Sequence, residues 1–156
     1  MFYIIFTGKQ ELMNDAPTLE VYLYELNQQV ENYIAELDDL ALSPVLKSRD
    51  YYAAERLLQV LIEACIGISK RWIKKLAKPI PHDAYKSFEV LVSQGLLSRD
   101  DLLKWRKIIG LRNALVHDYL NVDKLIILNI LQQRHYYEMQ QFIQFATTHL
   151  LAASKL

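Results

Sequence analysis

The stretch SRDYYAAERLLQVLIEACIGISKRWIKKLA, residues 48–77, decides the fold. It contains one glycine and no proline, and leucine, isoleucine and alanine recur through it at helical spacing. This pattern predicts a long helix, and so few helix-breaking residues argue against a many-stranded sheet. Pro79 and Pro81 follow closely, and neither can donate a backbone hydrogen bond. We therefore predict one helix from about Ser48 to Ala77.

Similar patterns predict helices on both sides of this stretch. Upstream, apolar residues separated by alternating steps of four and three form a packing seam that ends at Ser43-Pro44. Its N-cap candidate is Asp15, and downstream Ser98 is another, followed by acidic residues. These lengths predict an all-α, antiparallel up-and-down bundle of about five helices. The predicted helices cover residues 15–42, 48–77, 82–93, 98 onward, and about 122–152.

The composition fits a single domain with one hydrophobic core. Of the 156 residues, 52% are hydrophobic; we assign residues 16–152 to the domain and residues 1–15 to an N-terminal extension without an assigned role. Cys65 lies in an apolar run and has no second cysteine to pair with, which fits a reducing cytosol. No run of about 18 apolar residues occurs, so we expect no membrane span. The four histidines are too widely separated for a zinc site, and we expect neither metal nor cofactor.

The segment GLRNALVHDY, residues 110–119, holds the candidate site. It places an arginine, an amide, an imidazole and a phenol close together in an apolar helical region. Arg112 offers a planar, permanently charged fork that suits phosphate oxygens. Histidine is the side chain suited to take and give protons near neutral pH, so His117 is a candidate proton-transfer group. Tyr119 adds a phenolic hydroxyl, and Asn113 lies one turn before the histidine.

The spacing within this motif does not bring its residues together automatically. Five residues of α-helix turn through roughly 500°, which leaves Arg112 and His117 about 140° apart. Asn113 and His117 share one face, and Arg112 and Tyr119, seven residues apart, share another. Convergence requires the arginine to sweep round, the helix to end near Tyr119, or a second copy of the chain to complete the site. We favour the second copy.

The same segment resembles the signature of the HEPN superfamily. That signature is Arg-x4-His followed by x-Tyr, here Arg112, His117 and Tyr119, and the longer GLRNALVHDYLNVD is similar to the HepT toxin branch. YYAAERLLQVLIEACIGISK, residues 51–70, resembles the second helix of that branch, and SFEVLVSQGLLS, residues 87–98, resembles its middle segment. The resemblance thus covers most of the chain in the same order.

The resemblance implies a symmetric dimer with two motifs facing across a cleft, metal-independent RNA cleavage, and a nucleotidyltransferase antitoxin of the MntA type as partner. It further implies that this partner transfers AMP onto Tyr119. RNA carries its own nucleophile, the 2′-hydroxyl, so the protein needs to move protons and stabilise charge. His117 would act as general acid or base, and Arg112 would hold the phosphate. Asn113 is interpreted as a positioning residue, and the whole as a cytosolic ribonuclease toxin.

Two plainer interpretations stay open. Arg112 could form a helix-end salt bridge, with His117 hydrogen-bonded to the backbone. The chain could also be a non-catalytic HEPN-fold subunit that binds a nucleotidyltransferase or a nucleotide, with the motif serving that interface. Cleavage of RNA in a chelator separates such a binding module from an enzyme.

A basic run occupies the second half of the long helix. Arg71, Lys74, Lys75 and Lys78 share one helix face, Lys70 precedes them, and no acidic residue lies among them. A solvated face is the default interpretation, and contact with an RNA backbone is the alternative. The chain is neutral overall, but its first 46 residues hold eight acidic side chains against one basic, so the remainder is basic. Faces that bind partners can therefore differ in sign.

Overall fold

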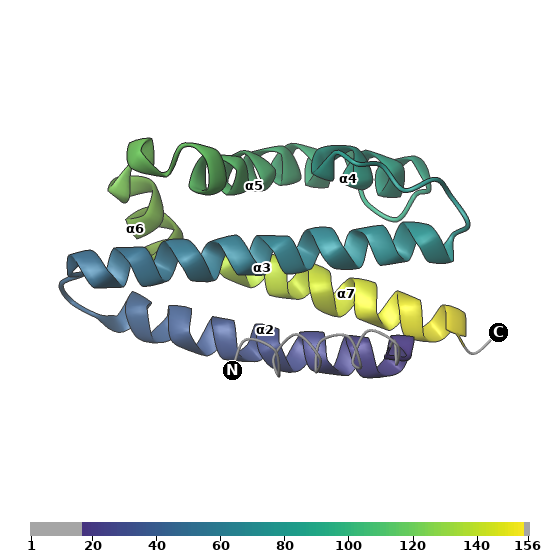
Figure 1. Ribbon diagram of the computed structural model, residues 1–156, viewed down its shortest axis with the longest axis horizontal. Helices are drawn as coiled ribbons and strands as arrows, with labels where there is room; N and C mark the ends of the chain where they lie inside the picture. The colour runs from purple at the N-terminus through teal and green to yellow at the C-terminus, as the bar shows by residue number, and fades with distance from the viewer. Residues whose placement is uncertain (1–16, 155–156) are drawn as a thin grey trace, which may run out of the picture.

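The structure is an all-α bundle arranged around one central helix (Figure 1). The computed structural model describes residues 17–154, and the predicted extension 1–15 with its N-cap candidate Asp15 lies outside the described residues. Figure 1 shows α3 running between α2 and α7 on one side and α4 and α5 on the other. The described helices are α2 (Leu19–Leu42), α3 (Ser48–Lys75), α4 (Ala84–Ser93), α5 (Arg99–His117), the short 3-10 helix η1 (Tyr119–Asn121), α6 (Lys124–Gln133) and α7 (Tyr136–Ser154).

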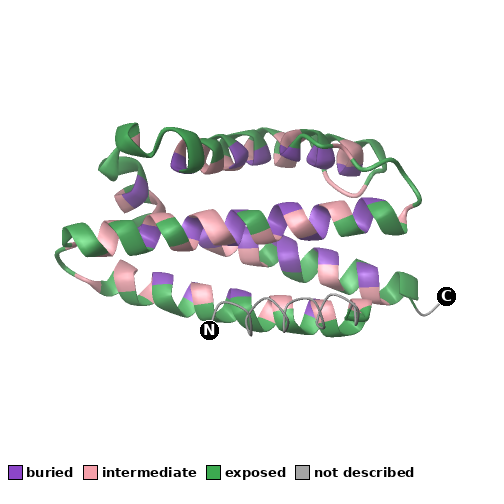
Figure 2. Cartoon of the chain, viewed as in Figure 1, coloured by how far each residue is buried: buried purple, intermediate pink, exposed green. Residues whose placement is uncertain are grey.

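Helix α3 confirms the prediction made from its apolar pattern. It contacts α2, α4, α5, α6 and α7, so its buried face is wide, as Figure 2 shows along its length. The helix ends at Lys75, close to the predicted end, and Ala77 then takes a left-handed conformation with φ of 56° before the prolines. The buried residues of α3 are Ala54, Leu58, Leu61, Ile62, Cys65, Ile66, Ile68, Ser69, Trp72 and Ile73.

The helix starts follow local capping chemistry. Helix α2 begins after Thr18, whose hydroxyl accepts a hydrogen bond from the Val21 amide. Helix α4 begins later than predicted, because the Asp83 side chain, and not His82, accepts from the Lys86 amide as N-cap. In each helix the capping side chain accepts a hydrogen bond from one of the backbone amides that the first turn of a helix leaves unpaired.

The predicted last helix is in fact two helices. Arg134 takes a left-handed conformation, with φ of 54° and ψ of 39°, and ends α6. Its amide donates to the carbonyl of Leu131, and the His135 amide donates to that of Ile130, which closes the helix end. Helix α7 then starts at Tyr136 in a new direction. No residue in this stretch is a glycine or proline, so the sequence carried no visible breaker.

An aromatic cluster fixes α5 against its neighbours. Trp105 is buried on α5 and stacks on Phe88 of α4, with ring centroids 4.2 Å apart. The same indole meets Phe142 of α7 edge-on at 4.7 Å. Such pairs add to the burial of large apolar surface, and they hold α5 in a defined position. None of the helices between residues 17 and 154 has the length and apolar content that a membrane crossing needs.

Candidate functional site

Helix α5 carries the motif, and side-chain hydrogen bonds cap its start. Ser98 and Asp101 form a reciprocal capping box: the Asp101 amide donates to the Ser98 hydroxyl at 3.1 Å, and the Ser98 amide donates to the Asp101 carboxylate at 3.0 Å. The backbone hydrogen bond from Ser98 is the main cause of a lowered pKa at Asp101. The N-cap predicted at Ser98 is confirmed.

The motif itself lies at the other end of α5, where the helix stops. The last helical residue is His117, and the Asp118 amide donates to the carbonyl of Ala114 at 2.8 Å. Tyr119 then begins the short helix η1, and Asn121 donates a side-chain hydrogen bond to Asp118 at 2.7 Å. The helix therefore ends before Tyr119, but Arg112 and His117 both lie within it, so this ending does not bring those two together. The expectation that Tyr119 shares a helical face with Arg112 is wrong, because α5 ends two residues earlier.

Arg112 points toward α3 rather than along α5. Its Nε lies 3.6 Å from Oε1 of Glu63, and the side chains of the two residues are 20% and 46% exposed. A pair this open to solvent contributes at most about 1 kcal/mol to stability. The salt bridge of the plainer interpretation thus exists, but its partner lies on another helix. Sequence reasoning missed Glu63, whose one signal was an acidic residue within an apolar helical run.

His117, Asn113 and Tyr119 are all exposed. Tyr119 exposes 64% of its surface, which leaves its hydroxyl open to a large reactant. Within the described residues, neither the imidazole of His117 nor the amide of Asn113 makes a side-chain hydrogen bond. In the single chain Asn113, interpreted as a positioning residue, therefore does not hydrogen-bond to the imidazole, and the backbone contact of the plainer interpretation is not formed by His117.

One chain does not bring Arg112 and His117 to face each other. On α5, Leu115 marks the core side, since it is buried. On a regular helix Arg112 lies about 60° from Leu115 and His117 about 160° from it, on the opposite side. Arg112 accordingly contacts α3, and His117 stands in solvent. The chain thus presents a phosphate-binding cation and a proton-transfer group on different sides of one helix end.

Large apolar side chains surround the end of α5. Leu120 is 83% exposed, Leu125 70%, and Ile126 50%. A groove of about 600 Å³ continues from this region between α5 and the α6–α7 segment, with Leu103, 61% exposed, and Leu111 among its lining residues. Charged and polar side chains, among them Lys107 and Glu138, also line this groove. Exposed apolar side chains beside such a groove are candidates for an interaction surface.

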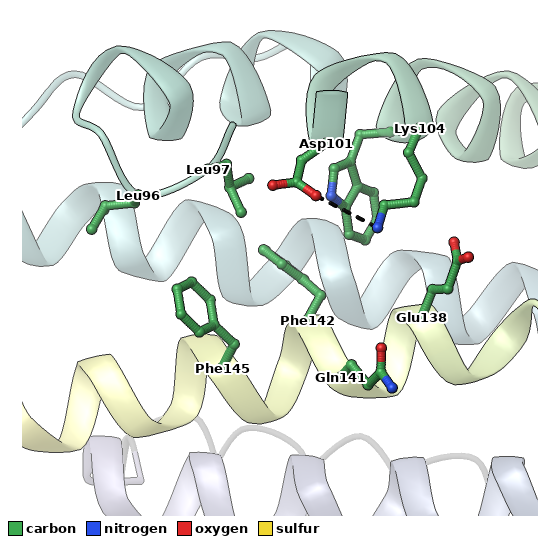
Figure 3. Close-up of a pocket in the computed structure, with 9 residues that line it drawn as sticks. Leu96, Leu97, Asp101, Lys104, Glu138, Gln141, Phe142 and Phe145 are labelled. Carbon is green, nitrogen blue, oxygen red and sulfur yellow. Dashed lines mark ion pairs between the residues drawn. The ribbon is translucent and has the colours of Figure 1, made fainter. Parts of the chain in front are cut away.

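A smaller hollow of about 240 Å³ lies beyond the groove, toward the start of α5 (Figure 3). Trp105 and Phe142 are among its lining residues, as are Lys104 and Asp101, which form an ion pair of 3.5 Å. Lys104 also lines the larger groove, so the two are neighbours. Figure 3 shows apolar side chains on one side of this hollow and charged or polar side chains on the other, and none of the motif residues lines it.

The basic run of α3 lies away from the motif. Lys74 is eleven residues past Glu63, which corresponds to about 16 Å along the helix axis. Lys70 donates to the carbonyl of His82 at 3.3 Å, and the guanidinium of Arg71 stacks on Tyr22, 3.7 Å from the ring centroid. The remaining members of the run, Lys74, Lys75 and Lys78, are exposed. The prediction that Lys78 shares their helix face is wrong, because α3 ends at Lys75 and Ala77 turns the chain before it. The structure therefore gives Lys70 and Arg71 contacts within the chain and does not bring the run to the motif.

The remaining candidate residue, Cys65, has a structural role. Cys65 is buried on α3, and burial raises the pKa of its thiol well above the ordinary value, as expected of a core residue rather than a nucleophile. Within residues 17–154, no three histidine, cysteine, aspartate or glutamate side chains gather as a metal site would require.

The fold and the motif together define a class: an all-α bundle whose Arg-x4-His-x-Tyr sequence spans the end of a helix that packs on the central helix. The family model described as "HepT-like: Ribonuclease HepT-like" matches residues 27–146. The chain therefore belongs to the HepT-like ribonuclease family, and the resemblance drawn from the motif and its flanking helices is confirmed.

Individual relatives agree with this assignment. The chain is similar to the mRNA nuclease HepT of Shewanella oneidensis, with 33% identity over 86 residues, which covers 55% of this chain and 64% of that protein. It is similar to the tRNA nuclease HepT of Aphanizomenon flos-aquae, with 26% identity over 113 residues and coverage of 72% and 77%. The solved structure of the tri-AMPylated Shewanella oneidensis HEPN toxin in complex with its MNT antitoxin superposes with a TM-score of 0.72 at 22% identity, covering 81% of this chain and 96% of that one. At that identity the likeness establishes the fold.

Proposed function

We propose that this protein is a cytosolic ribonuclease toxin that acts as a homodimer, cleaves RNA without a metal, and is silenced by a nucleotidyltransferase that transfers AMP onto Tyr119. The observation that carries the proposal is the placement of the motif. Arg112, His117 and Tyr119 lie at an exposed helix end in a chain of the HepT-like ribonuclease family. Relatives named as an mRNA nuclease and a tRNA nuclease support RNA as the substrate class.

The divergence of Arg112 and His117 supports the homodimer. Each chain presents the two groups on different sides of α5, so the motif of one chain alone forms half of a site. The exposed apolar residues Leu120, Leu125 and Ile126 adjoin the same helix end and offer the surface that a second copy would cover. In a symmetric dimer the same surface serves both subunits, which would place two motifs across the axis.

The chemistry then follows from the two histidines of the dimer. His117 of one subunit takes the proton from the RNA 2′-hydroxyl, whose oxygen attacks the adjacent phosphorus and forms the new O2′–P bond. The P–O5′ bond breaks, and the 5′-oxygen leaves with a proton from the other subunit's histidine. Arg112 holds the phosphate and stabilises the added negative charge of the transition state. Products are a 2′,3′-cyclic phosphate and a 5′-hydroxyl, and no metal enters the balance.

Silencing by nucleotide addition fits the position of Tyr119. Its exposed hydroxyl stands two residues beyond His117, so an attached AMP would occupy the space that RNA needs. The phosphodiester would also carry a negative charge into that space, where Arg112 could bind it in place of substrate. The nucleotidyltransferase of the proposal is supported by the antitoxin present in the structurally similar complex.

The test is digestion of total RNA by the purified protein in excess chelator. We expect the wild type to cleave, a folded His117→Ala variant to lose the activity by about 100-fold or more, and the matched control His82→Ala to cleave normally. His82 is exposed, and it is its backbone carbonyl that accepts the bond from Lys70. Cleavage by His117→Ala would disprove the catalytic assignment. A wild type that binds the nucleotidyltransferase but leaves RNA intact would instead support the non-catalytic binding subunit, which the Arg112–Glu63 pair favours.

A further inference from the structure

The guanidinium of Arg112 has its Nε beside a carboxylate, and its side chain is partly exposed. Its Nε is buried and has no hydrogen-bond partner within the described residues. The nearest acidic atom is Oε1 of Glu63, at 3.6 Å, which is too long for a hydrogen bond but close enough for an ion pair. The side chain is nevertheless 20% exposed. This exposed area lies on atoms other than Nε.

We propose that Glu63 is a positioning residue that holds Arg112 through Nε and so turns its two terminal amino groups toward the RNA phosphate. The inference rests on the proposed function and adds to it a residue from outside the motif. A buried donor without a partner is uncommon in native proteins and calls for an explanation. Here a carboxylate stands beside that donor and needs a shift of a few tenths of an ångström to accept from it.

The geometry of a guanidinium makes this arrangement useful. Its five N–H donors lie in one plane, and a carboxylate at Nε leaves the outer donors of both terminal nitrogens free for the oxygens of a phosphate. An arginine without such a contact would sample many rotamers and would present its donors in a poorly defined direction. A fixed donor pair is worth more in the transition state than a mobile one, since no reorganisation is needed when charge develops.

Glu63 is suited to this role because its backbone is fixed. It lies near the middle of the central helix α3, and its neighbour Ile62 is fully buried while Ile66, three residues on, is also buried. The carboxylate itself is 46% exposed, so the residue is not part of the core. Through its pair with Arg112 an acidic side chain at this place contributes at most about 1 kcal/mol to stability, and it reduces the attraction of the site for RNA. Its presence is explained if it orients Arg112.

The proposal predicts opposite effects on rate and on affinity. Removing the carboxylate removes one negative charge from beside the phosphate, so RNA should bind equally well or more tightly. The reaction should slow, because the cation is no longer aligned with the transition state. A residue that merely stabilised the fold would lower both together with the melting temperature.

The experiment compares Glu63→Gln, Glu63→Ala and the control Glu31→Gln, an exposed acid on α2 that forms no ion pair within the described residues. Single-turnover cleavage of a labelled RNA oligonucleotide gives the rate at saturation, and a 2′-O-methylated copy, which lacks the nucleophile, gives the dissociation constant. We expect Glu63→Ala to lose about 10- to 100-fold in rate with an unchanged or lower dissociation constant. Glu63→Gln keeps an acceptor for Nε and should lose less, and Glu31→Gln should match the wild type.

The outcomes separate this inference from the proposed function. If the wild type cleaves, His117→Ala does not, and both Glu63 variants equal the wild type, then the ion pair has no role and the inference is overturned. A faster reaction in Glu63→Ala overturns it as well, because Glu63 would then mask Arg112. If RNA is not cleaved at all, the proposed function fails, and hydrogen exchange at Arg112 Nε still tests the contact: loss of Glu63 should expose this N–H, and unchanged exchange would refute the positioning.

Discussion

Asp38 should be one of the most destabilising polar positions to replace in this protein. Its carboxylate accepts hydrogen bonds from the hydroxyls of Tyr136, at 2.6 Å, and Tyr137, and it pairs with Arg134 at 3.1 Å. These contacts join α2 to the turn between α6 and α7, which is the break that the apolar pattern did not predict. Replacing Asp38 by alanine leaves the hydroxyl of the buried Tyr136 without its acceptor.

The magnitude follows from the separate contacts. The bond from Tyr136 joins a buried donor to a charged acceptor and is worth about 1.5–3 kcal/mol. The ion pair to Arg134, whose side chain is 45% exposed, contributes at most about 1 kcal/mol. With a part-buried bond from Tyr137 added, we expect Asp38→Ala to lower the free energy of unfolding by about 3 kcal/mol. For a domain of this size that corresponds to a fall of about 6–12 °C in melting temperature.

The pH dependence gives an independent check on the same cluster. Burial opposes ionisation of Asp38, but the hydrogen bonds from Tyr136 and Tyr137 and the charge of Arg134 together outweigh it, so its pKa is lowered from the ordinary value of 3.8. A carboxyl with a lowered folded-state pKa contributes its stability above the ordinary pKa and loses it as the pH falls through the lower, folded-state value. The difference between wild type and Asp38→Asn should therefore be full at neutral pH and shrink below about pH 4.

Thermal and urea unfolding of Asp38→Ala, Asp38→Asn and the control Asp39→Asn measure these effects. Asp39 is the adjacent residue on α2 and is exposed, so its replacement should leave stability within about 0.5 kcal/mol of the wild type. Asp38→Asn should lie between the wild type and the alanine variant, because the amide keeps one acceptor. If Asp38→Ala unfolds at the wild-type temperature, the cluster does not hold the α6–α7 turn and the reasoning is wrong.

Two further predictions concern the proposed dimer and its silencing. Leu120→Glu places a charge on the most exposed apolar residue beside the motif. The mass measured by sedimentation should fall from twice the 18.3 kDa of one chain to that of a single chain, and RNA cleavage should be lost. A fully active monomer would refute the shared site. Tyr119→Phe should remain unmodified when the nucleotidyltransferase is co-expressed, whereas the wild type gains AMP at Tyr119, and intact-mass measurement with peptide mapping that found the nucleotide elsewhere would disprove this assignment.

The parts of the fold that the sequence predicted depend on local signals. The long run on α3 has apolar residues at helical spacing and prolines after it, and the box at Ser98 and Asp101 needs residues three apart. The ends of these elements were placed within a few residues. The break at Arg134 was missed because no glycine or proline marks it. Arg134 there donates a hydrogen bond to Asp38, ninety-six residues away. Contacts of this range leave no trace in local spacing.

The candidate site shows the same division. The motif residues were found by their types and spacing, and the end of α5 at His117 places them at the surface. Their relative positions were harder to predict, because the angle between Arg112 and Tyr119 depends on where α5 ends. The helical-face argument assumed that the helix continued to Tyr119. Glu63 was missed for a different reason. It acts across two helices, so the one sequence feature that it offers is an acidic residue within an apolar helical run.

The side chains of α5 that pack in the core and the proposed proton-transfer group point in different directions from the helix axis. Trp105 and Ile109 are buried, and Trp105 anchors the helix through aromatic contacts to α4 and α7. On a regular helix Arg112 lies about 20° from Trp105, on the packed side where it meets α3, and His117 lies about 120° from Trp105, away from that side. A change at His117 can therefore alter proton transfer with little effect on folding, since an exposed side chain with no contact in the bundle is removed. Arg112 and Glu63 lie at the contact between α3 and α5, so a change at either residue affects this contact. The orientation of the phosphate-binding cation therefore depends on the same packing that holds the bundle together. The central helix thus determines where the cation points, and the second copy of the chain would supply the proton-transfer group that a single α5 cannot bring to it.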